Sequence, residues 1–341
     1  MSSVVETPVA ALADPGDLSD EQLRRMYRTM VTGRHLAERF WILSRQGKTH
    51  FVITSQGHEA AQVGSAMAMH KGSDYLYTYY RSMSVALTMG FTPYDLLLGV
   101  FGKRDDPYSG GRQLPNHPSS VAWRMPTGSS SVATQMAHAV GSAYAARVKG
   151  EDFVAISYSG EGATAKGDFH ETVAIASIHK LPVIFLIENN HYAISVPEQY
   201  ELPEGGVANR VAKGYAMHAV LIDGTDVIAV YNATREARER ALRGDGPTLI
   251  EASCVRLVAH SSDDNDRYRT DEMRNELKKY DPVPRMRHFL IERGLLDEES
   301  DAEMVREITA EIRESLDRAE AAPAADPAEA CRHIFAEKGY A

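Results

Sequence analysis

The spacing of apolar side chains near the start of the chain predicts a long amphipathic helix. Ser19 followed by Gln22 forms a capping-box pattern, which marks a helix N-terminus. Apolar residues then recur at near-helical spacing, namely Leu23, Met26, Tyr27, Met30, Phe40 and Leu43. We therefore expect a helix over roughly residues 20 to 46, with its apolar stripe facing the core. A second, alanine-rich helix is expected over about 56 to 69.

Three continuous apolar runs in the middle of the chain predict buried strands. They are FVAISYS at 153–159, LPVIFLIEN at 181–189 and TLIEASCVRLV at 248–258. A helix is expected before the first run, ending near Gly150, and another between the first two runs, over about 166 to 179. Strands that alternate with helices favour an α/β fold with a doubly wound, mostly parallel sheet and helices on both faces.

The ends of the chain differ from this central pattern. Residues 1–18 are expected to form a flexible N-terminus, and residues 19–320 an α/β domain that finishes in helices from about Asp271. The segment AAPAADP then predicts a linker before a short terminal helix, within 321–341. Inside the domain, residues 101–120 are dense in Gly, Pro, Ser and charge, which indicates a long loop; such loops are usually functional.

Composition and charge narrow the classes of function. The 341 residues are 43% hydrophobic and 25% charged, proportions typical of a globular protein with a sizeable core. The formal net charge is −10 and no long run of lysine or arginine is present, so nucleic acid is not expected as a partner. No apolar run is long enough to span a bilayer, and no signal or transit pattern is recognisable. With two cysteines that lack CxxC spacing, these features predict a cytoplasmic protein without a membrane partner.

A carboxylate and an amide follow two of the predicted strands. Gly160-Glu161-Gly162 comes directly after the first apolar run, and Asn189-Asn190 comes at the end of the second. A parallel crossover brings the carboxyl ends of both strands to the edge where open α/β sheets bind ligands, so Glu161 and Asn190 can meet. A carboxylate, an amide oxygen and a backbone carbonyl suit Mg²⁺, which commonly shares its coordination with phosphate oxygens. The glycines let a diphosphate approach the backbone closely.

Other phosphate and metal motifs do not fit the chain. GEGATAKGD lacks the Gly-Lys pair of a Walker A loop and the third glycine of a dinucleotide fingerprint. His58-Glu59 does not extend to HExxH, and the acidic run at 263–266 lacks the glycine and the spaced glutamate of an EF-hand. Taken singly, the glycines, Glu161 and the asparagine pair each suit an ordinary turn. Only their joint spacing favours a site for a metal and a diphosphate.

The same segment resembles a known enzyme family. The arrangement from Gly160-Glu161-Gly162 to Asn189-Asn190 is similar to the thiamin diphosphate and Mg²⁺ motif. GDFHE, KLPVIF and ENNHYAIS resemble the α subunit of the E1 component of 2-oxo acid dehydrogenase complexes. The resemblance extends over about residues 20 to 330, through GHEAAQVGSA, YYRSM, SGGRQLP, SSSVATQ and PTLIEA. Within the family, AHSSDDNDRYR is most similar to the branched-chain enzymes.

This resemblance implies roles for residues around the metal and the diphosphate. Glu161, Asn190 and the backbone carbonyl of Tyr192 match the Mg²⁺ ligands. Tyr80 and Arg81 match the pair that contacts the diphosphate, for which a guanidinium is well suited. Further cofactor-binding positions implied by the family are Ser130 and Val132 beside the aminopyrimidine ring, with Gly160, Gly162 and Ala163 along the diphosphate.

Two histidines match positions of the family where chemistry takes place. His260 matches the active-site histidine that lies near the cofactor and takes part in reductive acylation, and His117 falls near the substrate entrance. Each also has a simpler interpretation, because His260 could hydrogen-bond a loop and His117 could be exposed in a proline-rich segment. Glu188 departs from the family, since some relatives carry a phosphate-binding Arg there. Arg81 and His260 would therefore carry more of the diphosphate charge.

The resemblance implies the reaction and the partners. The family carries out thiamin diphosphate-dependent oxidative decarboxylation of a 2-oxo acid, here a branched-chain one, and then acylates the lipoyl group of a lipoyl-bearing E2 acyltransferase. A β subunit supplies the carboxylate that activates the aminopyrimidine, so an α₂β₂ heterotetramer is implied. Two alternatives stay open, namely an enzyme acting on pyruvate or acetoin and a non-catalytic assembly subunit. The second is disfavoured because the metal and phosphate residues are intact.

Overall fold

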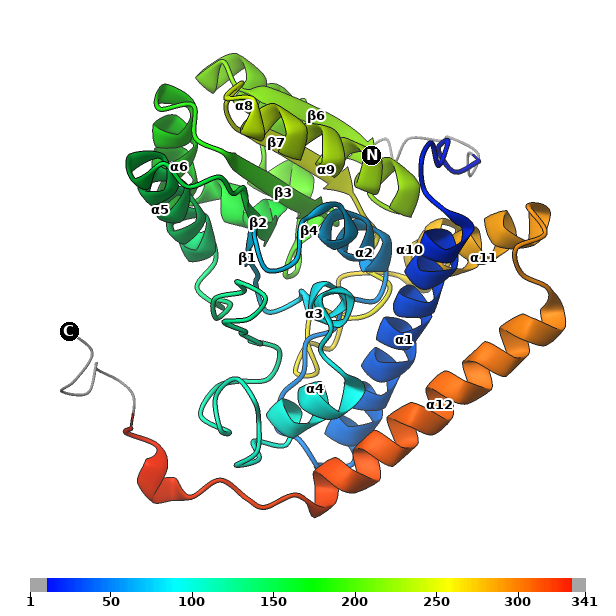
Figure 1. Ribbon diagram of the computed structural model, residues 1–341. Coiled ribbons are helices and arrows are strands. Elements are labelled where there is room, and N and C mark those ends of the chain that lie inside the picture. The colour runs from blue at the N-terminus through cyan, green and yellow to red at the C-terminus, as the bar shows by residue number, and fades with distance from the viewer. Residues whose placement is uncertain (1–10, 333–341) are drawn as a thin grey trace.

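A parallel sheet forms the centre of the structure, a computed structural model that describes residues 11–332 (Figure 1). Its strands are β1 (Tyr75–Tyr77), β2 (Ala155–Gly160), β3 (Val183–Asn189), β6 (His218–Asp223) and β7 (Thr248–Ser253), in the order β1-β2-β3-β7-β6. Each neighbouring pair in this order is parallel. The α/β fold with a parallel sheet that the sequence predicts is therefore confirmed.

Helices cover both faces of the sheet. One face is packed by α5 (Thr134–Lys149), α6 (Gly167–Ile178) and α8 (Gly206–Tyr215), and the other by α2 (Glu59–Ala68) and α9 (Val227–Leu242). Along β3, Phe185 and Ile187 belong to the first of these two cores, whereas Ile184 and Leu186 belong to the second. Successive side chains of a strand point to opposite faces, so a strand buried on both sides consists of one unbroken apolar run.

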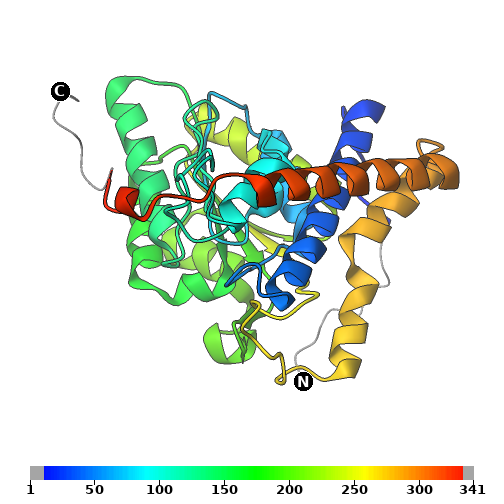
Figure 2. The same ribbon diagram turned by 90° about the horizontal axis from the view of Figure 1, so that it is seen from below.

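Further helices extend from the face that α2 and α9 cover (Figure 2). They are α1 (Asp20–Arg45), α3 (Met83–Met89), α4 (Pro93–Val100), α10 (Asp271–Leu277), α11 (Pro282–Glu292) and α12 (Glu298–Ala321). The long helix α12 packs across the outside of α4 and α1. The shorter elements are α7 (Glu198–Glu201), the 3₁₀ helices η1 (Glu161–Ala165), η2 (Lys278–Tyr280) and η3 (Pro327–Glu329), and an antiparallel pair, β4 (Tyr192–Ala193) with β5 (Val196–Pro197). None of the helices within residues 11–332 has the length and apolar character needed to cross a membrane.

The sequence predicts β2, β3, β7 and several of the helices, but not all of their limits. The helix expected over 20 to 46 is α1, and both hydrogen bonds of the Ser19–Gln22 capping box form. The next helix begins at Glu59 and not at 56, because Gly57 adopts a left-handed φ of +95° that interrupts it. Sequence reasoning missed the strand β6, whose apolar run is only four residues long, from Ala219 to Ile222, and whose side chains are half-buried or exposed at the sheet edge.

The predicted division of the chain into 1–18, 19–320 and 321–341 stays a prediction. Residues 1–10 of the expected N-terminus and residues 333–341 of the expected terminal helix lie outside the described residues. Between these limits, α12 ends at Ala321, and η3 is the element that follows it.

Close packing of α2 on α9 requires a glycine at position 64. A Cβ added to Gly64 would lie 2.4 Å from the carbonyl oxygen of Val227 and 3.1 Å from the amide nitrogen of Tyr231. Both contacts are with backbone atoms of α9, which no side-chain rotation can relieve. The two helices therefore approach one another as closely as their backbones allow, and α2 is held at a fixed height above the sheet.

Replacing Gly64 by alanine is expected to lower the free energy of unfolding by about 1–3 kcal/mol, because α2 and α9 must move apart. The matched change Gly141→Ala lies in the exposed part of α5, where an added Cβ meets no atom within 4 Å. It is expected to raise the free energy of unfolding by about 0.5–1 kcal/mol, because alanine favours helix over glycine. Urea unfolding of the purified protein measures both values. A midpoint for Gly64→Ala at or above that of the wild type would contradict this packing.

Candidate active site

The parallel pairing of β2 with β3 brings Glu161 and Asn190 together at one edge of the sheet. Gly160, the last residue of β2, pairs with Glu188 near the end of β3. The next residues along each chain therefore emerge side by side, and Oε2 of Glu161 accepts a hydrogen bond of 3.2 Å from the backbone N–H of Asn190. Glu161 is only 1% exposed and Asn190 8%. The two residues thus meet as their spacing predicts.

The oxygen atoms of this pair fit a divalent cation. Burial raises the pKa of Glu161, although the backbone N–H groups of Glu161 and Asn190 oppose this shift. Oδ1 of Asn190 is buried and has no hydrogen-bond partner among the described residues. A buried acceptor without a partner is costly, and a desolvated carboxylate gains most from a nearby positive charge. Within residues 11–332 no cluster of three or more His, Cys, Asp or Glu could hold a metal. A metal here would therefore depend on mixed ligands of this kind, which suit Mg²⁺.

The chain after β3 folds back over the turn that carries Glu161. His191 and Ile194 have left-handed φ angles of 66° and 57°, which bend the backbone on both sides of β4. A Cβ added to Gly162 would lie 2.8 Å from the Cβ of Ala193, so glycine is needed for β4 to approach η1. Tyr192 is the other residue of β4. This contact brings the backbone of Tyr192 beside the turn that carries Glu161.

Arg81, Tyr80 and His260 form a second group. Arg81 is buried, and its Nη1 donates to the carbonyl of Thr54 at 2.6 Å. Its Nη2 donates to Nδ1 of His260 at 3.2 Å, so a neutral His260 must carry its proton on Nε2. The ring of Tyr80 meets the ring of His260 edge to face, with centroids 6.0 Å apart. The three residues therefore combine a fixed cation with a fixed N–H donor.

Burial and nearby positive charge lower the pKa of His260 to about 4. Burial is the main cause, followed by the positive charges of Arg81 and Arg256, while Asp264 opposes the shift. Asp264 also accepts a hydrogen bond of 2.9 Å from the backbone N–H of His260. The imidazole is therefore neutral at pH 7, and an anion bound beside Arg81 would raise its pKa.

Arg256 is a site residue that sequence reasoning missed. It is 1% exposed, and its guanidinium lies 5.3 Å from the ring centroid of Tyr192. Its Nη1 donates to the carbonyl of Ile194 at 2.8 Å, and its Nη2 donates to the hydroxyl of Tyr268 at 2.6 Å. Arg256 thus links the β4 turn with the loop that follows His260. A charged residue inside the apolar run CVRLV was the signal available in the sequence.

His117 and Ser130 form a third group, at the end of the long loop. Nε2 of His117 lies 2.7 Å from the Ser130 hydroxyl, and Nδ1 lies 3.0 Å from the carbonyl of Leu114. A carbonyl can only accept, so Nδ1 carries the proton and Nε2 accepts the hydrogen of Ser130. Ser129 forms an isolated parallel bridge with Tyr79, which brings this loop beside the second group. Val132, two residues after Ser130, is half-buried.

A buried hydrogen-bond network beneath Asn190 centres on Glu188. Oε2 of Glu188 lies 2.6 Å from Nδ1 of His58 and accepts from Nε2 of Gln62 and Oη of Tyr79, each at 2.9 Å. All of these side chains are buried. Burial lowers the pKa of His58, although the hydrogen bond to Glu188 opposes this shift. Sequence reasoning missed the network because its members are far apart in the chain. Its one local sign is the spacing of four between His58, which directly precedes α2, and Gln62 on that helix.

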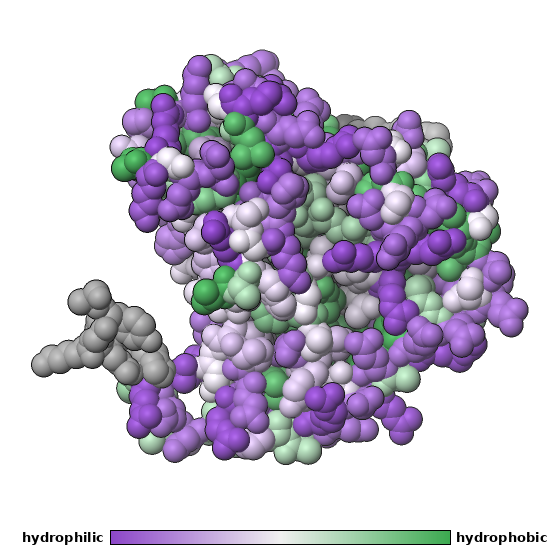
Figure 3. All heavy atoms as spheres, in the orientation of Figure 1, coloured by the Kyte–Doolittle hydropathy of each residue, from purple (hydrophilic) through white to green (hydrophobic). Residues whose placement is uncertain are grey.

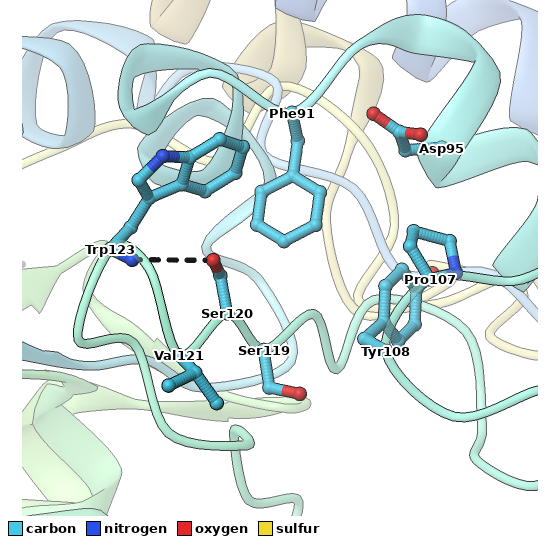
Figure 4. Close-up of a pocket in the computed structure, with 8 residues that line it drawn as sticks. All are labelled: Phe91, Asp95, Pro107, Tyr108, Ser119, Ser120, Val121 and Trp123. Carbon is cyan, nitrogen blue, oxygen red and sulfur yellow. Dashed lines mark hydrogen bonds between the residues drawn. The ribbon is translucent and has the colours of Figure 1, made fainter.

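Two hollows in the surface differ in their lining residues, and one of them adjoins the group formed by Arg81, Tyr80 and His260. A hollow of about 480 Å³ adjoins His260 and the loop that follows it, and Ile194 and Tyr268 also line it. Another, of about 380 Å³, lies between α4 and the long loop and is lined by Phe91 and Trp123 among other residues (Figure 4). None of the predicted site residues lines this second hollow. Only the hollow beside His260 belongs to the candidate active site.

Comparison with known proteins defines the class of this chain. Residues 27–328 match the model of the dehydrogenase E1 component family. Because the match covers most of the 341 residues, the chain belongs to this family, whose enzymes depend on thiamin diphosphate. The family that the sequence motifs predict is thereby confirmed.

Relatives within the family include several α subunits. The chain is 48% identical over 321 residues to 2-oxoisovalerate dehydrogenase subunit alpha of Bacillus subtilis (strain 168), which covers 94% of this chain and 97% of that protein. It is 37% identical over 317 residues to 3-methyl-2-oxobutanoate dehydrogenase subunit alpha of Mycobacterium tuberculosis (strain ATCC 25618 / H37Rv), covering 91% and 82%. Pyruvate dehydrogenase E1 component subunit alpha of Bacillus subtilis (strain 168) is 36% identical over 310 residues, covering 90% and 80%. The predicted similarity to the branched-chain α subunits is confirmed.

The protonation state of His260 gives a test of this geometry. In the protein without cofactor, the His260 resonance in a histidine NMR titration is expected to have its midpoint near pH 4, with the ring neutral above it. The pKa of His260 in the folded protein lies below its ordinary value of 6.5. The neutral ring therefore contributes stability to the fold above pH 6.5, and this contribution is lost as the pH falls through about 4. Arg81→Met is expected to raise the midpoint, because a nearby cation is removed. His260→Gln identifies the resonance, and a wild-type midpoint near 6.5 would contradict the geometry.

Proposed function

We propose that this protein is the α subunit of an E1 component. It would catalyse the thiamin diphosphate-dependent oxidative decarboxylation of branched-chain 2-oxo acids and the reductive acylation of the lipoyl group of an E2 component. The observation that carries the proposal is the 48% identity, over nearly the full length of both chains, to a 2-oxoisovalerate dehydrogenase subunit alpha. The meeting of Glu161 with Asn190, and of Arg81 with His260, supports it.

Thiamin diphosphate and Mg²⁺ are the cofactors in this proposal. Glu161, Asn190 and the backbone carbonyl of Tyr192 would hold the metal. Oδ1 of Asn190, which has no hydrogen-bond partner within residues 11–332, supports that role. Arg81 would contact the diphosphate beside Tyr80, because its guanidinium has five N–H donors, more than its contacts with Thr54 and His260 use. The remaining positions proposed to line the cofactor are Gly160, Gly162, Ala163, Ser130 and Val132.

The two histidines have different proton arrangements, and these support different catalytic roles. When bound, thiamin diphosphate supplies the carbanion chemistry that releases CO₂ from the 2-oxo acid. His260 presents an N–H at Nε2, which suits it to donate to the group that arrives in reductive acylation. Nε2 of His117 accepts a hydrogen bond from the Ser130 hydroxyl, which leaves the oxygen lone pairs of Ser130 available to accept from a ligand.

A β subunit and a lipoyl-bearing E2 acyltransferase are the proposed partners, with the α chain in an α₂β₂ heterotetramer. The names of the relatives support this, because each is an alpha subunit. Figure 3 shows hydrophobic residues at the surface over α5 and α6, where Tyr144, Val148, Ile175 and Ile178 are exposed. Apolar side chains gathered on adjacent helices are typical of a surface that another protein covers. We propose no nucleic-acid or membrane partner.

A cytoplasmic location completes the proposal. Cys254 and Cys331 are both free thiols, which fits a reducing compartment. The alternative function is that of an E1 α subunit acting on pyruvate or acetoin, and the 36% identity to a pyruvate enzyme keeps it open. A non-catalytic assembly subunit is less favoured, because it would not need a buried carboxylate beside an unpaired amide oxygen.

Glu161→Ala tests the metal site. In the α/β complex, this change is expected to weaken calorimetric binding of Mg²⁺ with thiamin diphosphate by at least about 10–100-fold, because a charged ligand is lost. Glu311→Ala on α12 makes the same change at an exposed position away from the site and is expected to leave binding unaltered. Equal binding by the wild type and Glu161→Ala would refute the ligand assignment.

The substrate class is tested by turnover with the purified β subunit present. We expect a higher kcat/KM for 3-methyl-2-oxobutanoate than for pyruvate, in line with the identity to branched-chain relatives. The α chain without the β subunit should be inactive with either substrate. A preference for pyruvate would favour the alternative enzyme, and full activity of the α chain alone would contradict the proposed heterotetramer.

A further inference from the structure

We propose that His58 is a positioning residue which, held by Glu188, turns the amide of Asn190 so that its oxygen faces the metal. An Asn amide has an oxygen at one end and an NH₂ group at the other, and only the oxygen can bind Mg²⁺. Something in the fold must therefore select one of two nearly isosteric orientations. This inference rests on the proposed function, because it requires a metal at Glu161 and Asn190.

The carboxylate of Glu188 fixes the tautomer of His58. An ionised carboxylate can only accept hydrogen bonds, and Oε2 of Glu188 lies 2.6 Å from Nδ1 of His58. Nδ1 must therefore carry a proton and donate it to Glu188. In a neutral imidazole the other nitrogen, Nε2, then has a lone pair and no hydrogen. His58 thus offers an acceptor on the side away from Glu188.

Asn190 lies on that accepting side. Nδ2 of Asn190 is 3.4 Å from Nε2 of His58, a long contact whose direction is nevertheless fixed, because only the amide NH₂ can donate to a lone pair. The amide oxygen then points away from His58, and it is the atom left without a partner among the described residues. Glu188, His58 and Asn190 therefore form a chain in which each hydrogen bond fixes the direction of the next.

The fold holds His58 rigidly in this position. His58 is completely buried, and it directly follows Gly57, where a Cβ would lie 2.0 Å from the carbonyl oxygen of Val255. The N–H of Gly57 donates to Glu59 at 2.7 Å, and Glu59 forms a 2.7 Å ion pair with Arg34 on α1. The turn before α2 is therefore held by the close contact of Gly57 with Val255 and by the hydrogen bond and ion pair of Glu59. The backbone that places the imidazole beside Glu188 is therefore fixed.

Two substitutions of His58 separate positioning from packing. Glutamine places an oxygen near the position of Nε2, so His58→Gln retains an acceptor for Asn190. Asparagine reaches only to the position of Nδ1, so His58→Asn retains a partner for Glu188 and removes the acceptor. The measurement is the Mg²⁺ concentration that half-saturates thiamin diphosphate binding to the α/β complex, followed by calorimetry. We expect His58→Asn to raise this concentration about 10–100-fold, as outer partners of metal ligands commonly do, and His58→Gln to raise it less than about threefold.

A double substitution tests whether the effect passes through the amide. Asn190→Asp replaces the amide by a carboxylate, which presents an oxygen in either orientation. Adding His58→Asn to Asn190→Asp should therefore cause no further loss of Mg²⁺ affinity. The positioning role would be overturned if His58→Asn lowered Mg²⁺ affinity as much in the Asn190→Asp variant as in the wild type. Equal Mg²⁺ requirements for His58→Asn and His58→Gln would overturn it as well.

The tautomer can be measured without any substitution. In the wild-type complex, ¹⁵N NMR of histidine should report a protonated Nδ1 and an unprotonated Nε2 for His58, and a proton on Nε2 would overturn the inference. The Glu161→Ala variant distinguishes this failure from that of the proposed function. If its Mg²⁺ requirement is unchanged, the metal site itself is wrong. If it rises while the His58 variants behave alike, only the positioning role is wrong.

Discussion

The register between β2 and β3 is the constraint on which the rest of the site depends. Because Gly160 pairs with Glu188 in a parallel ladder, the residues beyond each strand emerge at the same edge, and Glu161 bonds directly to Asn190. A slip of one residue would turn one of these side chains to the opposite face of the sheet. Both faces of β3 are buried, and its two sets of apolar side chains pack into separate cores on opposite sides of the sheet.

At the sheet edge where β2 and β3 end, buried negative and positive side chains lie in two separate groups. Carboxylates lie at the ends of β2 and β3, in Glu161 and Glu188. Arg81 and Arg256 lie beside His260, whose pKa is lowered mainly by burial and further by their charge. A metal diphosphate has the complementary arrangement, with a cation at one end and phosphate oxygens at the other. Burying each of these charges costs desolvation free energy. The hydrogen bonds around the charged groups offset part of this cost, and a bound metal diphosphate would offset more of it.

Sequence reasoning reached those parts of the site that periodicity and spacing encode locally. Unbroken apolar runs predicted β2 and β3, and the positions of Glu161 and Asn190 just beyond them predicted their contact. The interaction of His58 with Glu188 was out of reach, because the two residues are 130 positions apart and no local pattern pairs them. Tautomers and amide orientations are likewise properties of assembled contacts. A tautomer or an amide orientation can be assigned only when the acceptor at one end of a chain of hydrogen bonds is known.

The spacing of two between Glu188 and Asn190 has a consequence for how such a site can change over time. Residues two apart along an extended chain lie on the same side, and both of these side chains contact the single imidazole of His58. One strand end therefore carries both the ligand and the group that sets the tautomer of its neighbour. A substitution at position 188 alters what position 58 must be, so these two positions are expected to vary together among related chains while Asn190 stays constant. Such correlated variation would record the network in sequences for which no structure is known.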